Sequence, residues 1–493
     1  MASQSGSRNT HLDIPDFRLP TQRHHLDLPA PPQQLISTTD SQGPTVWSRQ
    51  LDSEPDCSPS YLVISGGTGC NAICAAFARA CYVLPVSDDG GSSSEIIRVL
   101  GGPSIGDIRS RLVRLIPHAP PGTPLNALRT LLAHRLPSGD HAELAAREEW
   151  RSVVEGRSSL WVGIPEDRKE TIRGTGWRFL VYFENEILRR AHKNFSFVNG
   201  SIGNFLLAAA QSFFRSLSSA IFLFSSITNS RANIVPVIST NHTVTIAAEL
   251  TNGTHLVGQC EISHPIPRPR SLTYEDEHEY MSSLSFDTIS PTMGNQRNVF
   301  FGAESKNSFE KLRASISRLY YINAYGHEIF PVPNPEYVSG LGSHEVLVYS
   351  CGSLWTSIIP CLALRGVASA IALSPTLRAK VLFLNAKNDR ETEGYTAVDY
   401  ILAIARTLNA RYQVEPYGLG PDNAATTYPV STFVTHLVYL RGCAVHLDAG
   451  LIRELGVNCV EVESDARGAD DIPLYDVACT KRAVELALGG SSC

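Results

Sequence analysis

The stretch YLVISGGTGCNA at residues 61–72 decides the fold class. An apolar, β-branched run ends in a glycine turn, and small and apolar residues suited to a crossover helix follow over residues 71–80. A second strand-like run at residues 82–86 completes a βαβ unit. A glycine turn that leads into a helix presents backbone amides to an anion, and phosphate is the ligand that we expect there. The residues expected to bind it are Gly66, Gly67, Thr68 and Gly69.

Similar short runs alternate with longer helical patterns along the chain. Those that start at Tyr61, Glu345 and Lys380 each lead into a polar or glycine turn and then into a helical pattern. This recurrence predicts a Rossmann-like α/β fold with a mainly parallel, doubly wound sheet and helices on both faces. Further strands are expected at residues 244–250, 255–262 and 457–463, and a buried helix followed by a strand at residues 205–227.

Composition limits the class of protein. The chain has 493 residues, of which 43% are hydrophobic and 18% are charged, as in a large folded protein. A net charge of −6 argues against a broad nucleic-acid-binding surface. Eleven cysteines without paired spacing argue against a disulfide framework or a zinc site. Because Gln211 and Arg215 interrupt the most apolar stretch, we expect no membrane span. The N-terminus has no basic start followed by an apolar segment, and Asp13, Asp16 and Asp27 argue against a transit peptide, so we expect a cytoplasmic protein.

Two segments differ from the rest in composition. Residues 1–58 are polar and rich in Ser, Pro and Gln without an apolar period, which predicts a disordered N-terminal tail. Residues 264–307 begin with a proline-rich run and continue as an acidic, serine-rich stretch, which predicts a surface insertion. Residues 59–490 are expected to form one large nucleotide-binding domain around that insertion.

The second expected strand ends in the sequence SDDGGSSS. At a strand terminus, Asp88 and Asp89 can hold a hydrated Mg²⁺ or accept hydrogen bonds from ribose hydroxyls, and both roles stay open. Gly90 and Gly91 let the backbone approach a ligand closely. Ser92 supplies a hydroxyl at the expected start of a helix.

A further polar turn has the sequence GDIR at residues 106–109. Asp107 can bind a ligand or cap the helix expected to run through Leu115. Arg109 beside a glycine-rich loop suits diphosphate recognition, with a solvated ion pair as the alternative.

Later turns contribute polar side chains near the ends of expected strands or the starts of helices. Each of them alone is more often a satisfied turn than a ligand site. Because the carboxyl ends of parallel strands border one crevice, we expect these side chains to line the same pocket. They are Asn204, Ser353, Thr356 and Asn385.

Together these strings resemble the family that groups 2-phospho-L-lactate transferase with the bacterial gluconeogenesis factor, a nucleotide-sugar-binding protein. The matching blocks are GGTG, SDDGGSSS, GDIR, SIGN, GSLWTSIIP and ETEGYT, in the family's order between residues 60 and 410. The resemblance implies a Rossmann-like fold and a nucleotide diphosphate pocket, with the glycine loop around phosphate and the acids of SDDGG near the diphosphate or Mg²⁺. It also implies that Asn204, Ser353 and Thr356 line this pocket.

Several positions depart from the family's pattern. Ser350 and Cys351 replace a glycine-proline pair, and Gly200 and Tyr400 replace two histidines. Any chemical role of those histidines is therefore missing from this chain. The stretch DDGGSSS with GDIR resembles the regulator branch, which disfavours the deazaflavin substrate of the transferase branch.

The sequence supports functions of different classes. The first is a phosphoryl or phosphoester transferase that binds a nucleotide diphosphate conjugate, with Mg²⁺ and with Asp88, Asp89 and Arg109 as catalytic residues. The alternative is a non-catalytic regulator that binds a UDP-sugar or a related nucleotide. A GxGxxA fingerprint at residues 67–72 leaves a weaker third hypothesis, a nicotinamide-dependent oxidoreductase. The expected partner is the nucleotide conjugate or nucleotide sugar, without nucleic acid or membrane, and a homo-oligomer is left open.

Overall fold

A computed structural model describes most of the chain after residue 58. The described residues belong to one compact unit, residues 57–493. The predicted tail, residues 265–307 of the predicted insertion, and Thr68 lie outside them. The described ranges are 59–67, 69–77, 80–139, 141–173, 179–231, 233–264, 311–410, 427–468 and 470–489.

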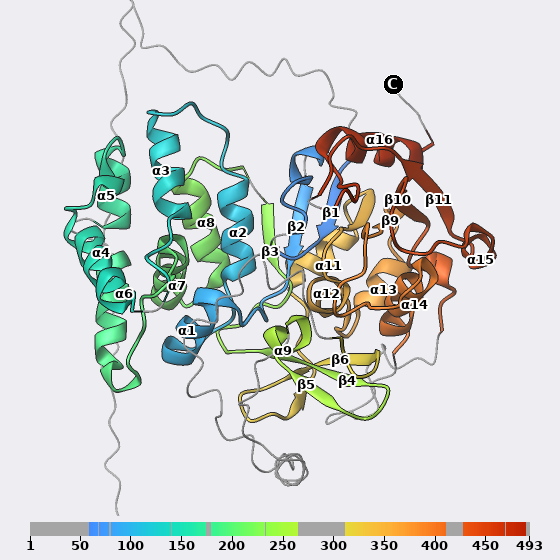
Figure 1. The fold of residues 1–493 in the computed structure, drawn as a ribbon, viewed down its shortest axis with the longest axis horizontal. Helices are drawn as coiled ribbons and strands as arrows, with labels where there is room; N and C mark the ends of the chain where they lie inside the picture. Colours follow the sequence, from blue (N-terminus) through green and yellow to red (C-terminus); the bar gives the residue numbers. More distant parts are fainter. Residues whose placement is uncertain are drawn as a thin grey trace, which may run out of the picture. The chain divides into compact units, whose positions relative to one another are not determined.

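Seven parallel strands form the main sheet, in the spatial order β11-β10-β9-β8-β1-β2-β3 (Figure 1). The order reverses at β1, which pairs with β2 on one side and with β8 on the other. This arrangement confirms the predicted Rossmann-like α/β fold and places a topological switch point between β1 and β8. The strands are β1 (Tyr61–Ile64), β2 (Ala80–Leu84), β3 (Asn233–Pro236), β8 (Val346–Tyr349), β9 (Ala379–Phe383), β10 (His436–Leu440) and β11 (Asn458–Val462).

The central strands are buried along their whole length. Leu62, Val63 and Ile64 of β1 have exposed fractions of 0%, and every residue of β8 is buried. Strands covered on both faces carry continuous apolar runs instead of an alternating pattern. That is why β1 and β8 are recognisable from the sequence.

Helices flank the main sheet. The helices between β2 and β3 gather on the β3 side of the sheet (Figure 1), where α2 and α8 contact β3. No described helix is long and apolar enough to cross a membrane. These helices are α1 (Gly91–Leu100), α2 (Gly106–Arg114), α3 (Pro124–Ala133), α4 (Glu143–Glu155), α5 (Glu166–Ile172), α6 (Phe179–Arg189), α7 (Ile202–Phe214) and α8 (Leu217–Ile227). Those of the C-terminal half are α11 (Pro335–Leu341), α12 (Ile359–Leu362), α13 (Val367–Ala372), α14 (Ala397–Leu408), α15 (Ala449–Glu454) and α16 (Val477–Ala487).

A second, antiparallel sheet has the strand order β5-β4-β6-β7 and lies below the main sheet in Figure 1. A strand was expected over residues 255–262, but β5 ends at Val257 because Gly258 turns with φ 92°. The chain then enters the short helix α9 (Gln259–Ser263). The strands are β4 (Thr245–Leu250), β5 (His255–Val257), β6 (Ile316–Ile322) and β7 (Glu328–Ile329).

Two helical predictions are wrong. Residues 71–77 form turns and a 3₁₀ helix, Cys74–Ala76, because side chains occupy the carbonyls that an α-helix would use, and Ala80 already belongs to β2. Arg114 Nε donates to Asn71 O at 2.8 Å, and Tyr82 Oη donates to Cys74 O at 2.7 Å. Residues 205–227 form two helices, α7 and α8, and no strand.

A helical arm, residues 137–199, was not predicted. It contains α4, α5 and α6 and leaves and rejoins the domain at one neck, where Leu136 N–H donates to Gly200 O and Asn199 N–H donates to Pro137 O, both at 2.9 Å. Its core is aromatic, with Trp150 stacked on Phe197 at a ring distance of 5.3 Å.

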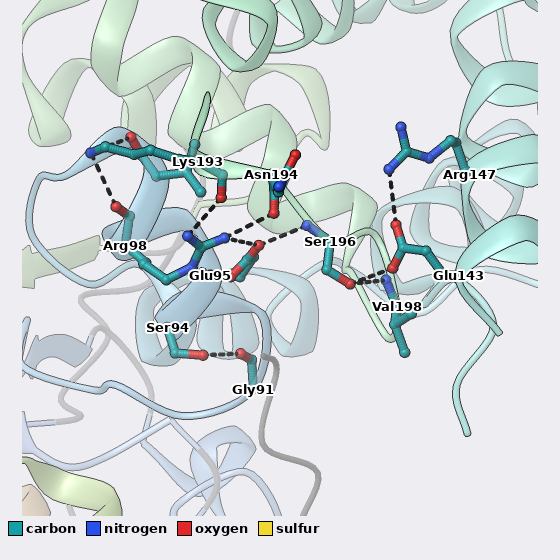
Figure 2. Close-up of polar contacts among 11 residues, drawn as sticks. Gly91, Ser94, Glu95, Arg98, Glu143, Arg147, Lys193, Asn194, Ser196 and Val198 are labelled. Carbon is teal, nitrogen blue, oxygen red and sulfur yellow. Dashed lines mark hydrogen bonds and ion pairs between the residues drawn. The ribbon is translucent and has the colours of Figure 1, made fainter. Parts of the chain in front are cut away.

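Polar contacts attach the helical arm to α1 (Figure 2). Glu95 on α1 accepts hydrogen bonds from Arg98 Nε at 2.8 Å and from the Ser196 backbone N–H at 2.7 Å. Arg98 also donates to the carbonyls of Lys193 at 2.7 Å and Asn194 at 3.0 Å. The arm is therefore joined to the helix that begins with the residues of SDDGGSSS.

Candidate functional site

The candidate site lies at the switch point, where β1 and β8 end. The glycine loop after β1 packs against the loop after β8, since a Cβ on Gly69 would lie 2.6 Å from Cys351 O and 2.8 Å from Gly352 Cα. A Cβ on Gly66 would lie 2.3 Å from Ser357 Oγ. Only glycine allows such close approach, so the two loops meet directly at the switch point, the position of the expected ligand crevice.

The glycine loop also packs against the first turn of α2. A Cβ on Gly67 would lie 2.4 Å from Asp107 Oδ1, and the Gly67 N–H donates to this carboxylate. The loop is followed by turns and a 3₁₀ helix, so the helix N-terminus that the phosphate and nicotinamide hypotheses assumed at this position is absent from the described residues. The helix that meets the loop is α2, supplied by GDIR.

Two side chains of α2 donate hydrogen bonds to the glycine loop and to the residue before it. Arg111 is fully buried and donates from Nη2 to Gly66 O at 3.0 Å and to Ser65 Oγ at 3.1 Å. Ser110 Oγ donates to Gly67 O at 2.9 Å. Arg111 Nε and Nη1 are buried without a hydrogen-bond partner among the described residues. Arg111 was not among the predicted site residues, because an arginine inside a polar helix is usually solvated.

Asp88 lies beside the start of α2. Its carboxylate accepts from Gly90 N–H at 3.0 Å and from Ser93 Oγ at 3.3 Å, and a Cβ on Gly106 would lie 2.3 Å from Asp88 Oδ2. Burial and the charge of Asp107 raise the pKa of Asp88 to about 8. Burial raises the pKa of Asp107 to about 6. Asp107 is the second residue of α2 and not its N-cap, and its carboxylate lies against the glycine loop while its charge acts on Asp88.

Asp89 is directed to α9. Its Oδ1 accepts from the Cys260 backbone N–H at 2.8 Å, and a Cβ on Gly258 would lie 2.1 Å from Asp89 Oδ2. The carboxylates of these adjacent acids therefore have different partners, Gly90 and Ser93 for Asp88 and Cys260 for Asp89. The carboxylate that meets Asp88 is that of Asp107, brought close by the fold and not by the sequence.

The acidic pair can be tested against a magnesium ion. The described residues contain no group of three or more His, Cys, Asp or Glu side chains that could hold a metal. Mg²⁺ in proteins is often held by one or two carboxylates and keeps several waters. Asp88 and Asp107 fit that pattern, since a cation between them would relieve the repulsion that raises the pKa of Asp88. Asp89 contributes less than Asp107 to the raised pKa of Asp88, and its carboxylate is directed to α9.

Arginine side chains border the acidic pair. Arg109 is 9% exposed, and its Nε donates to Asn204 Oδ1 at 2.9 Å. Arg135, at the neck of the helical arm, donates from Nη1 to Asn199 O at 3.2 Å. Burial and the nearby charge of Arg135 lower the pKa of Arg109 to about 10, whereas Asp88 acts in the opposite direction. Two cations that share one acidic neighbour favour an anionic ligand. Arg135 was missed because only the fold brings it to GDIR.

Asn204 is on the first turn of α7, as predicted, and connects two motifs. Its Nδ2 donates to Ser92 Oγ at 2.7 Å while its Oδ1 accepts from Arg109. Ser92 and Asn204 are buried, so they position Arg109 at the crevice. Gly91 has φ 54°, and a Cβ there would meet nothing within 4 Å, whereas a Cβ on Gly90 would lie 3.1 Å from Asp88 Oδ1.

The remaining predicted residues brace the loops after β8 and β9. Asn385 exchanges two hydrogen bonds with the Gly352 backbone, at 2.9 and 2.7 Å. Ser353 precedes a π-helix, Leu354–Ile358, in which buried Thr356 donates to Glu391 Oε1 at 2.5 Å. Burial and Asp389 raise the pKa of Glu391 to about 7. Glu391 belongs to the block ETEGYT, but it was not among the predicted site residues.

A separate groove of about 920 Å³ lies between β6 and α14. Arg318, Tyr320, Trp355 and Tyr395 are among the residues that line it. None of its described lining residues belongs to the glycine loop, SDDGG or GDIR, so it is distinct from the crevice.

Known proteins are similar to this chain in sequence. A family model described as 2-phospho-L-lactate transferase CofD matches residues 62–463. An uncharacterized protein of Saccharomyces cerevisiae (strain ATCC 204508 / S288c) is 33% identical over 438 residues, which cover 82% of this chain and 95% of that protein. A gluconeogenesis factor of Halalkalibacterium halodurans is 22% identical over 350 residues, 70% of this chain and 72% of that protein.

Solved structures support the fold. A crystal structure of a protein from Bacillus halodurans superposes with a TM-score of 0.52 at 18% identity and covers 87% of this chain and 99% of its own. At that identity the likeness concerns the fold alone. The family model spans most of the chain and includes every motif quoted above, which confirms the resemblance seen in the sequence. The chain therefore belongs to the 2-phospho-L-lactate transferase CofD family.

Proposed function

We propose that this protein binds a nucleotide diphosphate conjugate at the switch point and transfers a phosphorus-containing group from it. The observation that carries the proposal is the juxtaposition of an acidic pair, Asp88 and Asp107, with the cations Arg109 and Arg135. A diphosphate with a divalent cation is complementary to both pairs. The name of the family and the name of its transferase members support the same class of reaction.

Each part of the crevice has a chemical task in this proposal. Asp88 and Asp107 would hold Mg²⁺, which when bound neutralises diphosphate charge. Arg109 has its Nε on Asn204, which leaves its Nη groups to bind phosphate oxygens. Arg135 extends this cationic wall from the neck of the helical arm. No described residue is assigned as a general base.

The test is titration calorimetry of the full chain with nucleoside diphosphates and UDP-sugars, with and without Mg²⁺, followed by mass spectrometry for products. Binding should require Mg²⁺, and Asp107→Asn should weaken it at least tenfold, as should Asp88→Asn. Asp470→Asn removes a carboxylate from an exposed ion pair with Lys387 and is the matched control. Nucleotide binding that ignores Mg²⁺ and survives both site variants would refute the proposal.

A second candidate is a regulator that binds a nucleotide sugar without turnover. It is favoured by the positions where family members have histidine. A side chain at Gly200 would place its Cβ 2.4 Å from Phe205 Cζ, so a histidine does not fit there. Tyr400 is buried and donates to Thr392 Oγ1 at 2.9 Å. The gluconeogenesis factor relative supports this class. Tight binding of a UDP-sugar without any product by mass spectrometry would select it over the transferase.

A further inference from the structure

Helix α9 is attached at both ends to loops of the main sheet. At its first turn, the Cys260 N–H donates to Asp89 Oδ1 at 2.8 Å. At its last residue, Ser263 Oγ donates to Glu391 Oε1 at 2.8 Å. Asp89 follows β2 and Glu391 follows β9, and the strands between them in the sheet are β1 and β8. The attachments of α9 therefore flank the switch point, and Figure 1 shows α9 between the two sheets.

The Asp89 end is shaped by close packing. Gly258 has φ 92°, and a Cβ there would lie 2.1 Å from Asp89 Oδ2. A Cβ on Gly90 would lie 3.5 Å from the Cys260 thiol. A carboxylate at the first turn of a helix makes a charge-assisted hydrogen bond to the backbone. Asp89 therefore contacts α9 through a bond that replacement of Gly258 would disturb.

The Glu391 end couples α9 to the loop after β8. Glu391 is 2% exposed and accepts from Trp355 N–H at 3.0 Å and Thr356 N–H at 3.1 Å. Its other oxygen accepts from Thr356 Oγ1 and Ser263 Oγ. One buried carboxylate therefore joins α9 to the π-helix that begins directly after Ser353. Movement of α9 away from the sheet would break the Ser263 bond first, because the other three lie within the main domain.

We infer that Asp89 and Glu391 are positioning residues that latch α9 over the nucleotide crevice, and that Asp89 acts through α9 and not as a metal ligand. The inference rests on the proposed function, which supplies the nucleotide that α9 covers. With both latches closed, the nucleotide is enclosed between α9 and the loops after β1 and β8. Release of either latch opens a route for it to leave.

Hydrogen exchange of the full chain, measured by mass spectrometry without ligand, tests the latch directly. Asp89→Asn and Glu391→Gln should each raise the exchange rate of the amides in residues 258–264 by about tenfold or more, because each loses a charge-assisted bond. Exchange in β1 and β8 should stay as in the wild type, which separates release of α9 from general unfolding. Gly258→Ala keeps both carboxylates and should produce the same release. Glu249→Gln, on the exposed face of the small sheet with Arg318, is the matched control.

Nucleotide and metal measurements separate the latch from other roles. With GDP or UDP and MgCl₂ as probes, the latch variants should raise the dissociation rate of the nucleotide at least several-fold, while Asp89→Asn should leave the Mg²⁺ dependence near that of the wild type. Unchanged α9 exchange in Asp89→Asn, or a loss of Mg²⁺ affinity as large as that of Asp88→Asn, would overturn the inference. Faster exchange without faster nucleotide release would place α9 away from the crevice and would also overturn it. If neither nucleotide binds the wild type, the proposed function fails, whereas the ligand-free exchange still decides the latch.

Discussion

Arg109 donates a hydrogen bond from Nε to the side-chain oxygen of Asn204 at 2.9 Å. The same Asn204 amide donates to Ser92 Oγ at 2.7 Å, so one chain of side chains joins SDDGGSSS, GDIR and SIGN. The three motifs are distant in sequence and meet because α1, α2 and α7 pack together. Asn204 thereby fixes the direction of the guanidinium that faces Asp88 and Arg135.

Replacement of Asn204 tests this connection. Asn204→Ala leaves the buried Arg109 Nε without its acceptor, which should lower the free energy of unfolding by about 1–3 kcal/mol. It should also weaken nucleotide diphosphate binding at least tenfold, because the guanidinium loses its fixed orientation. Urea denaturation and calorimetry measure the two effects. Asn458→Ala removes an exposed contact with His436 and should change neither. Normal binding in Asn204→Ala would show that Arg109 does not need this anchor.

The acidic pair predicts how stability depends on pH. Folding raises the pKa of Asp88 from 3.8 to about 8 and that of Asp107 from 3.8 to about 6. The folded state therefore holds these protons more tightly than the unfolded state, and each carboxyl destabilises the fold once it ionises. The free energy of unfolding should fall as the pH rises from about 4 to about 8.

Asp88→Asn isolates the contribution of this carboxyl. The amide does not ionise, so the variant should lose less stability between pH 5 and pH 8 than the wild type, by about the contribution of one carboxyl. Glu391, whose pKa burial raises to about 7, acts with the same sign and should leave a residual slope. Denaturation series at several pH values measure the slopes. Equal slopes in the two proteins would show that Asp88 is not perturbed by burial and by Asp107.

The close approach of the two loops predicts the effect of a single methyl group. In Gly69→Ala the new Cβ would lie 2.6 Å from Cys351 O and 2.8 Å from Gly352 Cα, both backbone atoms that cannot move aside alone. We expect a loss of about 1–3 kcal/mol in the free energy of unfolding and weaker nucleotide binding. Gly342→Ala is the control, because its Cβ would meet Ser339 O at 3.6 Å, an ordinary contact. A Gly69→Ala protein as stable as Gly342→Ala would mean that the loops are not packed in this way.

The sequence predicted the parts of the fold that depend on local pattern. Strands β1 and β8 are continuous apolar runs because both faces are buried, and the glycines after β1 are required by contacts closer than any side chain allows. The position of Asn204 on the first turn of a helix was also readable, because an apolar run follows it directly. Motif order then identified the family.

What depends on the packing of distant elements was not predictable. Adjacent Asp88 and Asp89 look like a pair, but the Asp89 carboxylate binds the α9 backbone, and the charge of Asp107 on α2 has the larger effect on Asp88. Arg135 reaches the site only because the helical arm closes at its neck. Buried Arg111 has no local signal that distinguishes it from a solvated arginine. The helical arm has mixed helical patterns, and no motif in its sequence indicates that it contacts α1.

The attachment of the helical arm to α1 supplies a last prediction. Glu95 is 1% exposed and accepts from Arg98 at 2.8 and 2.6 Å and from the Ser196 N–H at 2.7 Å (Figure 2). Glu95→Ala removes the buried carboxylate that accepts from the Ser196 N–H and from Arg98, which is partly exposed. We expect the free energy of unfolding to fall by about 1–3 kcal/mol, and amide exchange at residues 193–198 to accelerate. Because Ser92 and Ser93 lie in the first turn of α1, nucleotide affinity should fall as well, by less than in Asn204→Ala.

Glu148→Ala is the control for this prediction. It removes an exposed pair with Arg151 and should lower the free energy of unfolding by about 0–1 kcal/mol. If Glu95→Ala matches Glu148→Ala in the free energy of unfolding and in amide exchange, the bonds of Glu95 do not hold the arm to α1.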